Sequence, residues 1–525
     1  MMSWSRVVPA LVAPCLLMAC TSSGPAARPS QDSSTSTSTS TSTSTSTSTS
    51  TSTSTGGASA SPDPSLAEFY GQHVTWQGCH DGFECAKVRV PVDYAAPGGA
   101  SIALSVVRLP SHGGDRLGSL LLNPGGPGAS GIDYALAAYS RISATVRKHY
   151  DIVGFDPRGV GASAPIRCLS DAQTDTFAAQ DGSPDNSAEE SALVRLAKLL
   201  GDRCEARNGG LLAHVGTRDT ARDLDVLRSI LGDNKLNFLG KSYGTYLGAI
   251  YAEMFPSRVG RVVLDGVVDP AADDDALARS QALGFERALA SFVDDCLPRS
   301  SCPLSGDRAS ALTQVSGILD KADRTPLRAS RPVNQSLALL GVAYAMYQPG
   351  LWEVLREALA QARTGNGSTL LLLADSYLDR DSKGHYSTNS NDAIYAISCL
   401  DRPETSDLAA LRARAKELAA VAPRFGAYLA WVFLPCSFWP VPPEGRAAPI
   451  RAAGAAPILV VGTTRDPATP YAFAKNLVAE LASSRLMTYV GDGHTAYEEG
   501  SGCINDAVDA FLVEGKLPAV GLRCH

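Results

Sequence analysis

The pentapeptide Gly240-Lys241-Ser242-Tyr243-Gly244 constrains the fold of this chain most, because it joins two contrasting patterns. The residues before it, 236–239, form a short apolar run typical of a buried strand. The residues after it, 245–252, are small and apolar, which suits a helix packed closely on a sheet. Glycines two residues before and after a serine permit a strained turn that lifts the hydroxyl out of the sheet. The segment therefore predicts a strand, a tight turn with an exposed serine, and a helix.

A phosphate-binding loop is the main alternative, because Gly240-Lys241-Ser242 is similar to the end of G-x-x-x-x-G-K-S. That motif requires glycine at position 235, where this chain has Lys235. We therefore exclude a phosphate-binding loop and interpret Ser242 as a catalytic nucleophile in an α/β-hydrolase fold.

A nucleophilic serine needs a histidine base and a carboxylate that orients it. In this fold they follow the serine in the order acid, then histidine. Asp466 follows the apolar run 457–462, and His494 follows the apolar run 485–490. Each is predicted to lie just past a strand, so we assign Asp466 as the acid and His494 as the base.

Each residue taken alone has a simpler interpretation. Asp466 precedes a proline and could be a turn residue, and His494 lies beside glycine and could be an exposed loop histidine. Asp492 is the rival carboxylate, but it lies two residues before His494 in the same loop. The joint order of Ser242, Asp466 and His494, each after a strand, favours the triad.

An oxyanion hole would complete the site. In this fold it uses the backbone N–H after the nucleophile, here Tyr243, and one from the loop after an early strand. The glycine-rich loop 123–128 follows the apolar run 120–122. We expect Gly126 to supply the second donor, although such a loop can also be a simple turn.

At these segments the chain resembles the secreted tripeptidyl-aminopeptidase-like α/β-hydrolases of actinobacteria, which are related to prolyl aminopeptidases. The matching segments are spread over about residues 75 to 525 and are 123–128, Phe155-Asp156-Pro157-Arg158-Gly159-Val160-Gly161-Ala162-Ser163, 240–244, Leu264-Asp265-Gly266-Val267-Val268-Asp269-Pro270, Asp466-Pro467-Ala468-Thr469-Pro470 and Gly493-His494.

The resemblance implies a serine exopeptidase that releases short, tripeptide-type units from peptides with a free N-terminus. Prolyl aminopeptidases carry histidine where this chain has Asn123, so strict proline selectivity is not implied. A carboxylesterase with the same triad is the alternative function. A non-catalytic envelope binding protein is a third, which the complete triad disfavours.

The N-terminus indicates export. Arg6 precedes an apolar stretch of 13 residues, Val7 to Ala19, which is too short to span a bilayer. It ends in Leu17-Met18-Ala19-Cys20, which resembles a bacterial lipobox. We therefore predict a signal peptide over 1–19 and lipidation at Cys20. The lipid would anchor the protein at the cell surface, on the outer face of the cytoplasmic membrane, from which a part of it could be released. Ordinary secretion with nearby cleavage is the alternative.

A low-complexity segment follows the lipobox. Serine and threonine alternate without interruption from Ser34 to Thr55. Such a tract has no apolar face to bury, so we predict a disordered tether over residues 20–65 with a coil span of roughly 40 Å.

Ten of the twelve cysteines remain when Cys15 and Cys20 are set aside. An even number in an exported chain favours disulfides. Short separations suggest Cys79–Cys85 and Cys296–Cys302, and our further assignments are Cys168–Cys204, Cys399–Cys436 and Cys503–Cys524. Metal binding is the alternative, but no C-x-x-C pair favours it, and neither a metal nor a cofactor is predicted.

Eight strand-like runs interleave with helical patterns, at 87–94, 101–109, 118–123, 151–155, 235–239, 260–265, 457–462 and 485–490. They predict a doubly wound, mostly parallel eight-stranded sheet. Helical patterns alone occupy the region between strands 6 and 7. We therefore predict a hydrolase core over 66–269 and 451–525 and a helical cap over 270–450. The alternative is a second, independent domain.

The formal net charge of −7 is mild, and no basic run favours nucleic-acid binding. A peptide substrate with a free N-terminus would need an anionic partner for its ammonium group. Asp269, Asp401 and Glu404, in or beside the cap, are the candidates, and the sequence does not choose among them. The sequence also does not indicate an oligomeric state.

Overall fold

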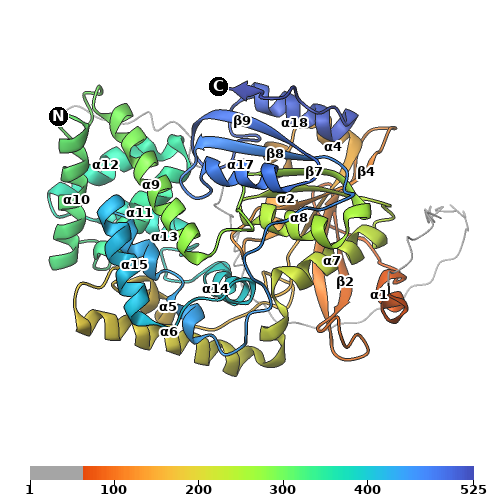
Figure 1. Ribbon diagram of the computed structural model, residues 1–525, viewed down its shortest axis with the longest axis horizontal. Coiled ribbons are helices and arrows are strands. Elements are labelled where there is room, and N and C mark those ends of the chain that lie inside the picture. Colours follow the sequence, from red (N-terminus) through yellow and green to blue (C-terminus); the bar gives the residue numbers. More distant parts are fainter. Residues whose placement is uncertain (1–62) are drawn as a thin grey trace, which may run out of the picture. The chain divides into compact units, whose positions relative to one another are not determined.

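The computed structural model describes residues 63–525 (Figure 1). The predicted signal peptide, Cys20 and nearly all of the predicted tether lie outside the described residues. Ten strands form one sheet in the order β1-β2-β3-β5-β4-β6-β7-β8-β9-β10. Their bounds are Gln77–His80 (β1), Phe83–Pro91 (β2), Ser101–Leu109 (β3), Gly118–Asn123 (β4), Tyr150–Phe155 (β5), Leu236–Lys241 (β6), Val259–Asp265 (β7), Ile458–Arg465 (β8), Ser484–Asp492 (β9) and Arg523–Cys524 (β10).

The strand directions divide the sheet into two parts. The pairs β1–β2, β2–β3 and β3–β5 are antiparallel. From β5 through β4, β6, β7, β8 and β9 to β10, every pair is parallel. Parallel strands place their carboxyl ends along one edge, which is where ligands bind in open sheets of this kind. The three residues assigned to the triad follow β6, β8 and β9 and so meet at that edge.

Helices cover both faces of the sheet. The α-helices of the core are Ala67–Tyr70 (α1), Gly131–Leu136 (α2), Ala138–Arg141 (α3), Ala144–His149 (α4), Asp171–Ala178 (α5), Ser187–Asn208 (α6), Thr217–Ile230 (α7), Tyr243–Met254 (α8), Tyr471–Glu480 (α17) and Gly502–Glu514 (α18). Side chains of α7, α8 and α17 share one apolar core with the sheet, and those of α2, α4 and α18 share another. Burial on both faces explains why β4 and β5 are fully buried and have apolar centres, 120–122 and 152–153.

All eight predicted strands are present, and the fold class is confirmed. The structure adds two short edge strands, β1 and β10, to the eight predicted. All four residues of β1 are exposed and β10 has only two residues, so neither carries a run of buried apolar side chains.

The region between β7 and β8 is helical. It contains Asp274–Cys296 (α9), Arg308–Arg324 (α10), Gln335–Tyr347 (α11), Trp352–Arg363 (α12), Ser368–Tyr377 (α13), Ser390–Asp401 (α14), Leu408–Val421 (α15) and Gly426–Trp431 (α16). Helices α9 to α13 enclose an apolar core of their own, which includes Phe292, Leu319 and Leu355. In Figure 1 these helices lie beside the sheet rather than on either of its faces.

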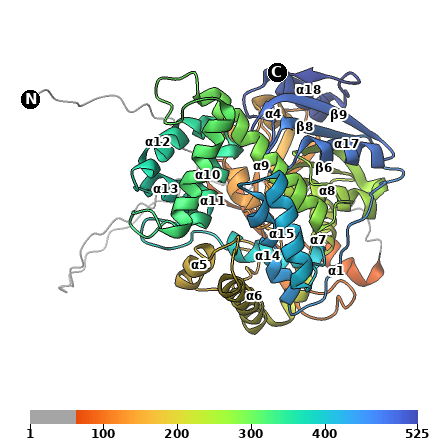
Figure 2. The same ribbon diagram turned by 60° about the vertical axis from the view of Figure 1, so that its left-hand side comes forward.

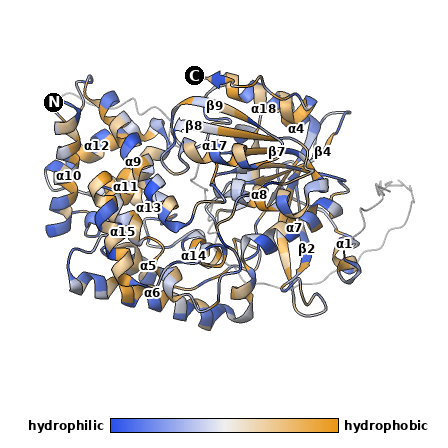
Figure 3. Ribbon diagram, viewed as in Figure 1, coloured by the Kyte–Doolittle hydropathy of each residue, from blue (hydrophilic) through white to orange (hydrophobic). Residues whose placement is uncertain are grey.

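Two of the helices listed above, α5 and α6, lie against the cap rather than on the sheet, although they come from the chain between β5 and β6. Both views place α5 and α6 beside the cap helices (Figures 1 and 2). Leu193 and Ala197 of α6 share a small core with Leu411 and Leu418 of α15. Along α6 the hydrophobic and hydrophilic colours alternate (Figure 3), as expected for a helix with one buried and one exposed face. The predicted cap bounds, 270–450, do not include these two helices and stay a prediction.

All five disulfide pairs assigned from the sequence are confirmed: Cys79–Cys85, Cys168–Cys204, Cys296–Cys302, Cys399–Cys436 and Cys503–Cys524. Among residues 63–525, no helix is both long and apolar enough to cross a membrane.

Candidate active site

Ser242 lies in the turn between β6 and α8, as the sequence predicts. Its backbone has φ 54° and ψ −125°, a strained conformation for a residue other than glycine. The flanking glycines make the turn sterically feasible. A Cβ on Gly240 would lie 2.3 Å from the Gly244 carbonyl oxygen, and one on Gly244 would lie 2.5 Å from the Asn123 oxygen. The G-x-S-x-G spacing is therefore required by close packing of the turn.

Asp466 and His494 are brought into contact by the ends of β8 and β9. The Nδ1 atom of His494 lies 2.9 Å and 3.0 Å from the two carboxylate oxygens of Asp466. The carboxylate is fully buried and the imidazole nearly so. A carboxylate at Nδ1 favours the tautomer that carries its proton there, which leaves Nε2 free to accept a proton.

The rival carboxylate, Asp492, has a different partner. Its two oxygens accept hydrogen bonds from the Arg465 guanidinium, both at 2.7 Å. The structure therefore pairs His494 with Asp466 and not with Asp492.

The glycine-rich loop 123–128 packs directly on the serine turn. A Cβ on Gly125 would lie 2.8 Å from Cβ of Ser242 and 3.0 Å from the Tyr243 nitrogen. Gly126 and Tyr243 both line the same cavity as Ser242. Within residues 63–525, neither backbone N–H of this pair donates a hydrogen bond to another group of the protein. Two unoccupied donors beside a nucleophile are what an oxyanion hole requires.

The cavity has a volume of about 290 Å³ and is lined mainly by apolar and aromatic side chains. Its floor includes Ser242 and Tyr243 from the core. The cap contributes most of the remainder, including Phe285 and Tyr347. Helices α5 and α6 also contribute, through Thr174, Phe177, Leu193, Ala197 and Leu200. The nucleophile therefore opens into a chamber built by three separate segments of the chain.

Of the three carboxylates proposed to bind a substrate amine, only Asp401 lines this cavity. It accepts hydrogen bonds from the Thr217 backbone N–H at 2.8 Å and from the Thr217 hydroxyl at 2.6 Å. Burial raises the pKa of Asp401 to about 6. Glu404 is instead paired with Arg414 at 2.7 Å, and Asp269 accepts from the Asn476 amide at 2.8 Å. The structure thus distinguishes three residues that the sequence leaves equivalent.

Two residues that touch the acid–base pair were not singled out from the sequence. The Thr469 hydroxyl lies 2.9 Å from an Asp466 oxygen and 3.3 Å from Nδ1 of His494. The Tyr347 ring meets the imidazole edge-on, with ring centroids 5.1 Å apart. A hydroxyl three residues after Asp466 could have indicated Thr469. Nothing local to Tyr347, which belongs to the cap, could have indicated its contact.

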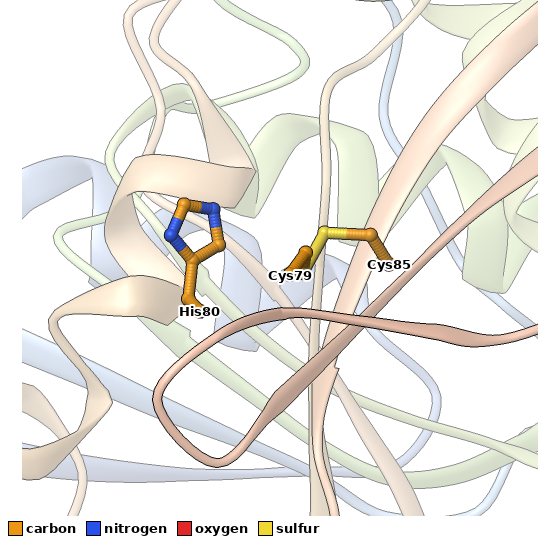
Figure 4. A group of neighbouring side chains, drawn as sticks. All are labelled: Cys79, His80 and Cys85. Carbon is orange, nitrogen blue, oxygen red and sulfur yellow. A yellow bond between two sulfur atoms is a disulfide. The ribbon is translucent and has the colours of Figure 1, made fainter. Parts of the chain in front are cut away.

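One group of side chains has the composition of a metal site. Cys79, His80 and Cys85 lie close together near the β1–β2 turn (Figure 4). The two cysteines are joined in a disulfide, so neither offers a thiolate. Only the exposed imidazole of His80 is left as a ligand, which does not make a metal site.

Comparison with known proteins places the chain among relatives of similar length. It is 41% identical over 478 residues to the serine protease Hip1 of Mycobacterium tuberculosis, which covers 86% of this chain and 91% of the relative. It is 34% identical over 466 residues to the tripeptidyl aminopeptidase of Streptomyces lividans, covering 86% of each chain. Residues 422–524 match the family described as TAP-like protein.

The chain belongs to the TAP-like family of α/β-hydrolases. This TAP-like protein is a serine hydrolase by its membership of that family. It is also 38% identical over 449 residues to the carboxylesterase B of Mycobacterium tuberculosis, which covers 84% of this chain and 86% of the relative. The family is the one that the sequence motifs resemble, so that prediction is confirmed.

Proposed function

We propose that this protein is a serine exopeptidase that releases short, tripeptide-type units from peptides with a free N-terminus. The observation that carries the proposal is the His494–Asp466 pair beside an enclosed cavity into which Ser242 opens. We infer that a peptide enters this cavity by its end, because side chains of the cap, such as Phe285 and Tyr347, line it together with Ser242.

In the proposed mechanism, Nε2 of His494 takes the proton of the Ser242 hydroxyl as its oxygen attacks the scissile carbonyl. Asp466 holds the imidazole and stabilises its protonated form. The N–H groups of Gly126 and Tyr243 bind the oxygen as it becomes negative. The imidazolium then protonates the leaving amine, and water, activated by the same imidazole, hydrolyses the acyl-enzyme. No metal or cofactor takes part in this scheme.

We assign Asp401 as the partner of the substrate ammonium group. Three observations favour it: it lines the cavity, it is nearly buried, and its carboxylate is fixed by Thr217. Loss of one partner of such a buried pair costs about 3–5 kcal/mol. N-acetylated peptides should therefore be cleaved with kcat/KM lower by roughly 10² to 10³.

A carboxylesterase is the second candidate, favoured by the mainly apolar lining of the cavity and by the relative named carboxylesterase B. The test is a substrate panel of free and N-acetylated peptide amides beside short-chain esters, on the wild type and Ser242→Ala. Faster cleavage of free-amine peptides supports the peptidase. Equal rates on free and acetylated peptides, with esters faster still, support the esterase.

The panel also tests the third interpretation, an envelope binding protein without catalysis. Removal of a triad serine should lower kcat by about 10⁶. A fluorophosphonate probe should label the wild type and not Ser242→Ala. A wild type that turns over no substrate and reacts with no probe would support the binding protein instead.

We also propose that the protein is exported and anchored at the outer face of the cytoplasmic membrane by lipid on Cys20. The lipobox-like segment 17–20 and the serine–threonine tract after it support this proposal. A single acyl chain binds a membrane only marginally, so stable anchoring needs two or more.

A further inference from the structure

The loop that carries His494 is fixed at four consecutive backbone N–H groups, those of residues 494–497. The first donates to the carbonyl of Tyr347 at 2.8 Å, and the second to the carboxylate of Asp466 at 3.2 Å. The third and fourth both donate to one oxygen of Asp265 at 2.9 Å. Two carboxylates therefore hold this loop, and only one of them contacts the imidazole.

Asp265 also contacts the nucleophile's turn, through its own backbone. It is the last residue of β7, and its carbonyl oxygen accepts a hydrogen bond from the Ser242 N–H at 3.0 Å. The next residue, Gly266, lies so close to the base that a Cβ there would be 3.5 Å from Cε1 of His494. One residue thus fixes the serine turn with its main chain and the histidine loop with its side chain.

Lys241, the residue between Gly240 and Ser242, completes the arrangement. It pairs in register with Asp265 across β6 and β7. Its buried ammonium group donates to the Tyr497 carbonyl at 2.7 Å and contacts Glu499 at 3.3 Å. The loop after His494 is therefore held by an anion at its N–H groups and by a cation at a carbonyl.

The charges of this pair depend on each other. Asp265 has no exposed surface, and burial raises the pKa of its carboxyl, while Lys241 and the loop N–H groups oppose that rise. Burial by itself would lower the pKa of Lys241, but Tyr134, Asp265 and Glu499 together raise it above its ordinary value. Each group thus shifts the pKa of the other toward its charged form.

We propose that Asp265 is a positioning residue for the base: with Lys241 it holds the His494 loop in register with Ser242. Its negative charge also favours the imidazolium that forms when His494 takes the serine proton. This inference rests on the proposed serine-peptidase function. Neither Asp265 nor Lys241 lines the cavity, so the pair should affect turnover and not substrate binding.

The test compares the full-length wild type with Asp265→Asn, which keeps the side-chain shape and removes the charge. We expect kcat to fall by up to about 10², the scale of a catalytic group displaced by 1 Å, with KM unchanged. The acid-side midpoint of the pH–rate profile should move to lower pH, because a neighbouring anion no longer stabilises the imidazolium. Inactivation by a fluorophosphonate should slow to the same extent as turnover.

A matched control is Asp233→Asn. Asp233 is also a carboxylate that accepts a strand N–H, from Ser119 at 2.9 Å, but it precedes β6 and so lies at the opposite end of the strand from Ser242. Its variant should keep the wild-type kcat and pH profile. Faster cleavage of free-amine than of N-acetylated peptides by the wild type, with an inactive Ser242→Ala, tests the proposed function independently. A failure of the Asp265 prediction is therefore not confused with a failure of that function.

A second variant covers the case in which Asp265→Asn does not fold because Lys241 loses its counter-charge. Asp265→Asn/Lys241→Met removes both charges, and a paired removal is better tolerated than a single one. It should retain a reduced kcat, with the acid-side midpoint closer to wild type than in the single variant. Wild-type kcat and pH profile in a folded variant would overturn the proposal. The proposal would also be overturned if the loss of activity were fully explained by a smaller fraction of active enzyme, as counted by titration of the active-site serine with the fluorophosphonate.

Discussion

Asp466 is held by more hydrogen bonds than its role as an acceptor for His494 requires. Its oxygens also accept from the backbone N–H groups of Ala468, Thr469 and Thr495 and from the Thr469 hydroxyl. These contacts fix the carboxylate in one orientation and therefore fix the imidazole. Because the donors lie in its own loop and in the histidine loop, the acid is oriented before any substrate arrives.

Asp466→Asn is predicted to keep the fold and to lower kcat by about 10⁴, because an amide at this position favours the wrong imidazole tautomer. Steady-state kinetics on a free-amine peptide amide would measure the loss, with circular dichroism as the check on folding. Asp492→Asn is the control: it breaks only the half-exposed contact with Arg465, so activity should stay near wild type. A crippled Asp492→Asn beside an active Asp466→Asn would refute the acid assignment.

Asp401 predicts a pH dependence that only substrates with a free amine should show. Its pKa of about 6 means that the carboxylate is neutral below that pH and charged above it. For free-amine peptides, kcat/KM should therefore rise as the pH increases through about 6, in addition to any change seen with an ester. In Asp401→Asn the two substrate classes should have the same profile. If the profiles already coincide in the wild type, Asp401 does not bind the amine.

The sequence predicts the triad residues because each follows a strand and their order along the chain is characteristic. It does not predict contacts made across large sequence separations. Asp265 ends a strand like many other residues, and only the folded chain brings it to the N–H of Ala496, 231 positions away. Tyr347 reaches His494 from the cap for the same reason.

At the scale of elements, the disulfide Cys399–Cys436 joins α14 to the 3₁₀-helix Leu434–Phe438 (η5). Both segments supply side chains to the cavity, and Asp401 is the last residue of α14. The disulfide therefore links the helix that carries Asp401, the proposed amine-binding residue, to a second segment of the cavity wall, η5.

We predict that Cys399→Ser/Cys436→Ser lowers the free energy of unfolding by about 2–5 kcal/mol and raises KM for free-amine peptides. Chemical denaturation and peptide kinetics would measure the two effects. The control is Cys79→Ser/Cys85→Ser, which removes a bridge over six residues between β1 and β2, neither of which lines the cavity. It should cost less stability, since the loop is shorter, and leave KM unchanged. A raised KM in the control alone would contradict the prediction.

The elements were predictable where burial on both faces gives a strand an apolar centre, as in β4 and β5. The edge strands β1 and β10 lack that pattern. Helices α5 and α6 show another limit, because an amphipathic helix reveals that it has a buried face but not which neighbour covers it. Their place against the cap follows from tertiary packing alone.

At the scale of the whole molecule, the proposed lipid anchor at Cys20 would determine where the enzyme acts. Cys20→Ala is predicted to move the protein from the membrane fraction to the medium, because lipid is then no longer attached. Cell fractionation and mass spectrometry of the mature N-terminus would test this. The matched control is Cys15→Ala, which lies within the predicted leader and should leave the protein at the membrane. A wild type that is fully soluble, with an unmodified N-terminus, would refute the anchor.

The cap interrupts the core between β7 and β8, which separates the serine from its acid and base along the chain. During synthesis, Ser242 is therefore made long before Asp466 and His494, which belong to the second part of the core. An unfinished chain has a nucleophile with no base, in a sheet that still lacks β8 and β9. The triad can therefore assemble only after the segment that carries β8 and β9 has been made.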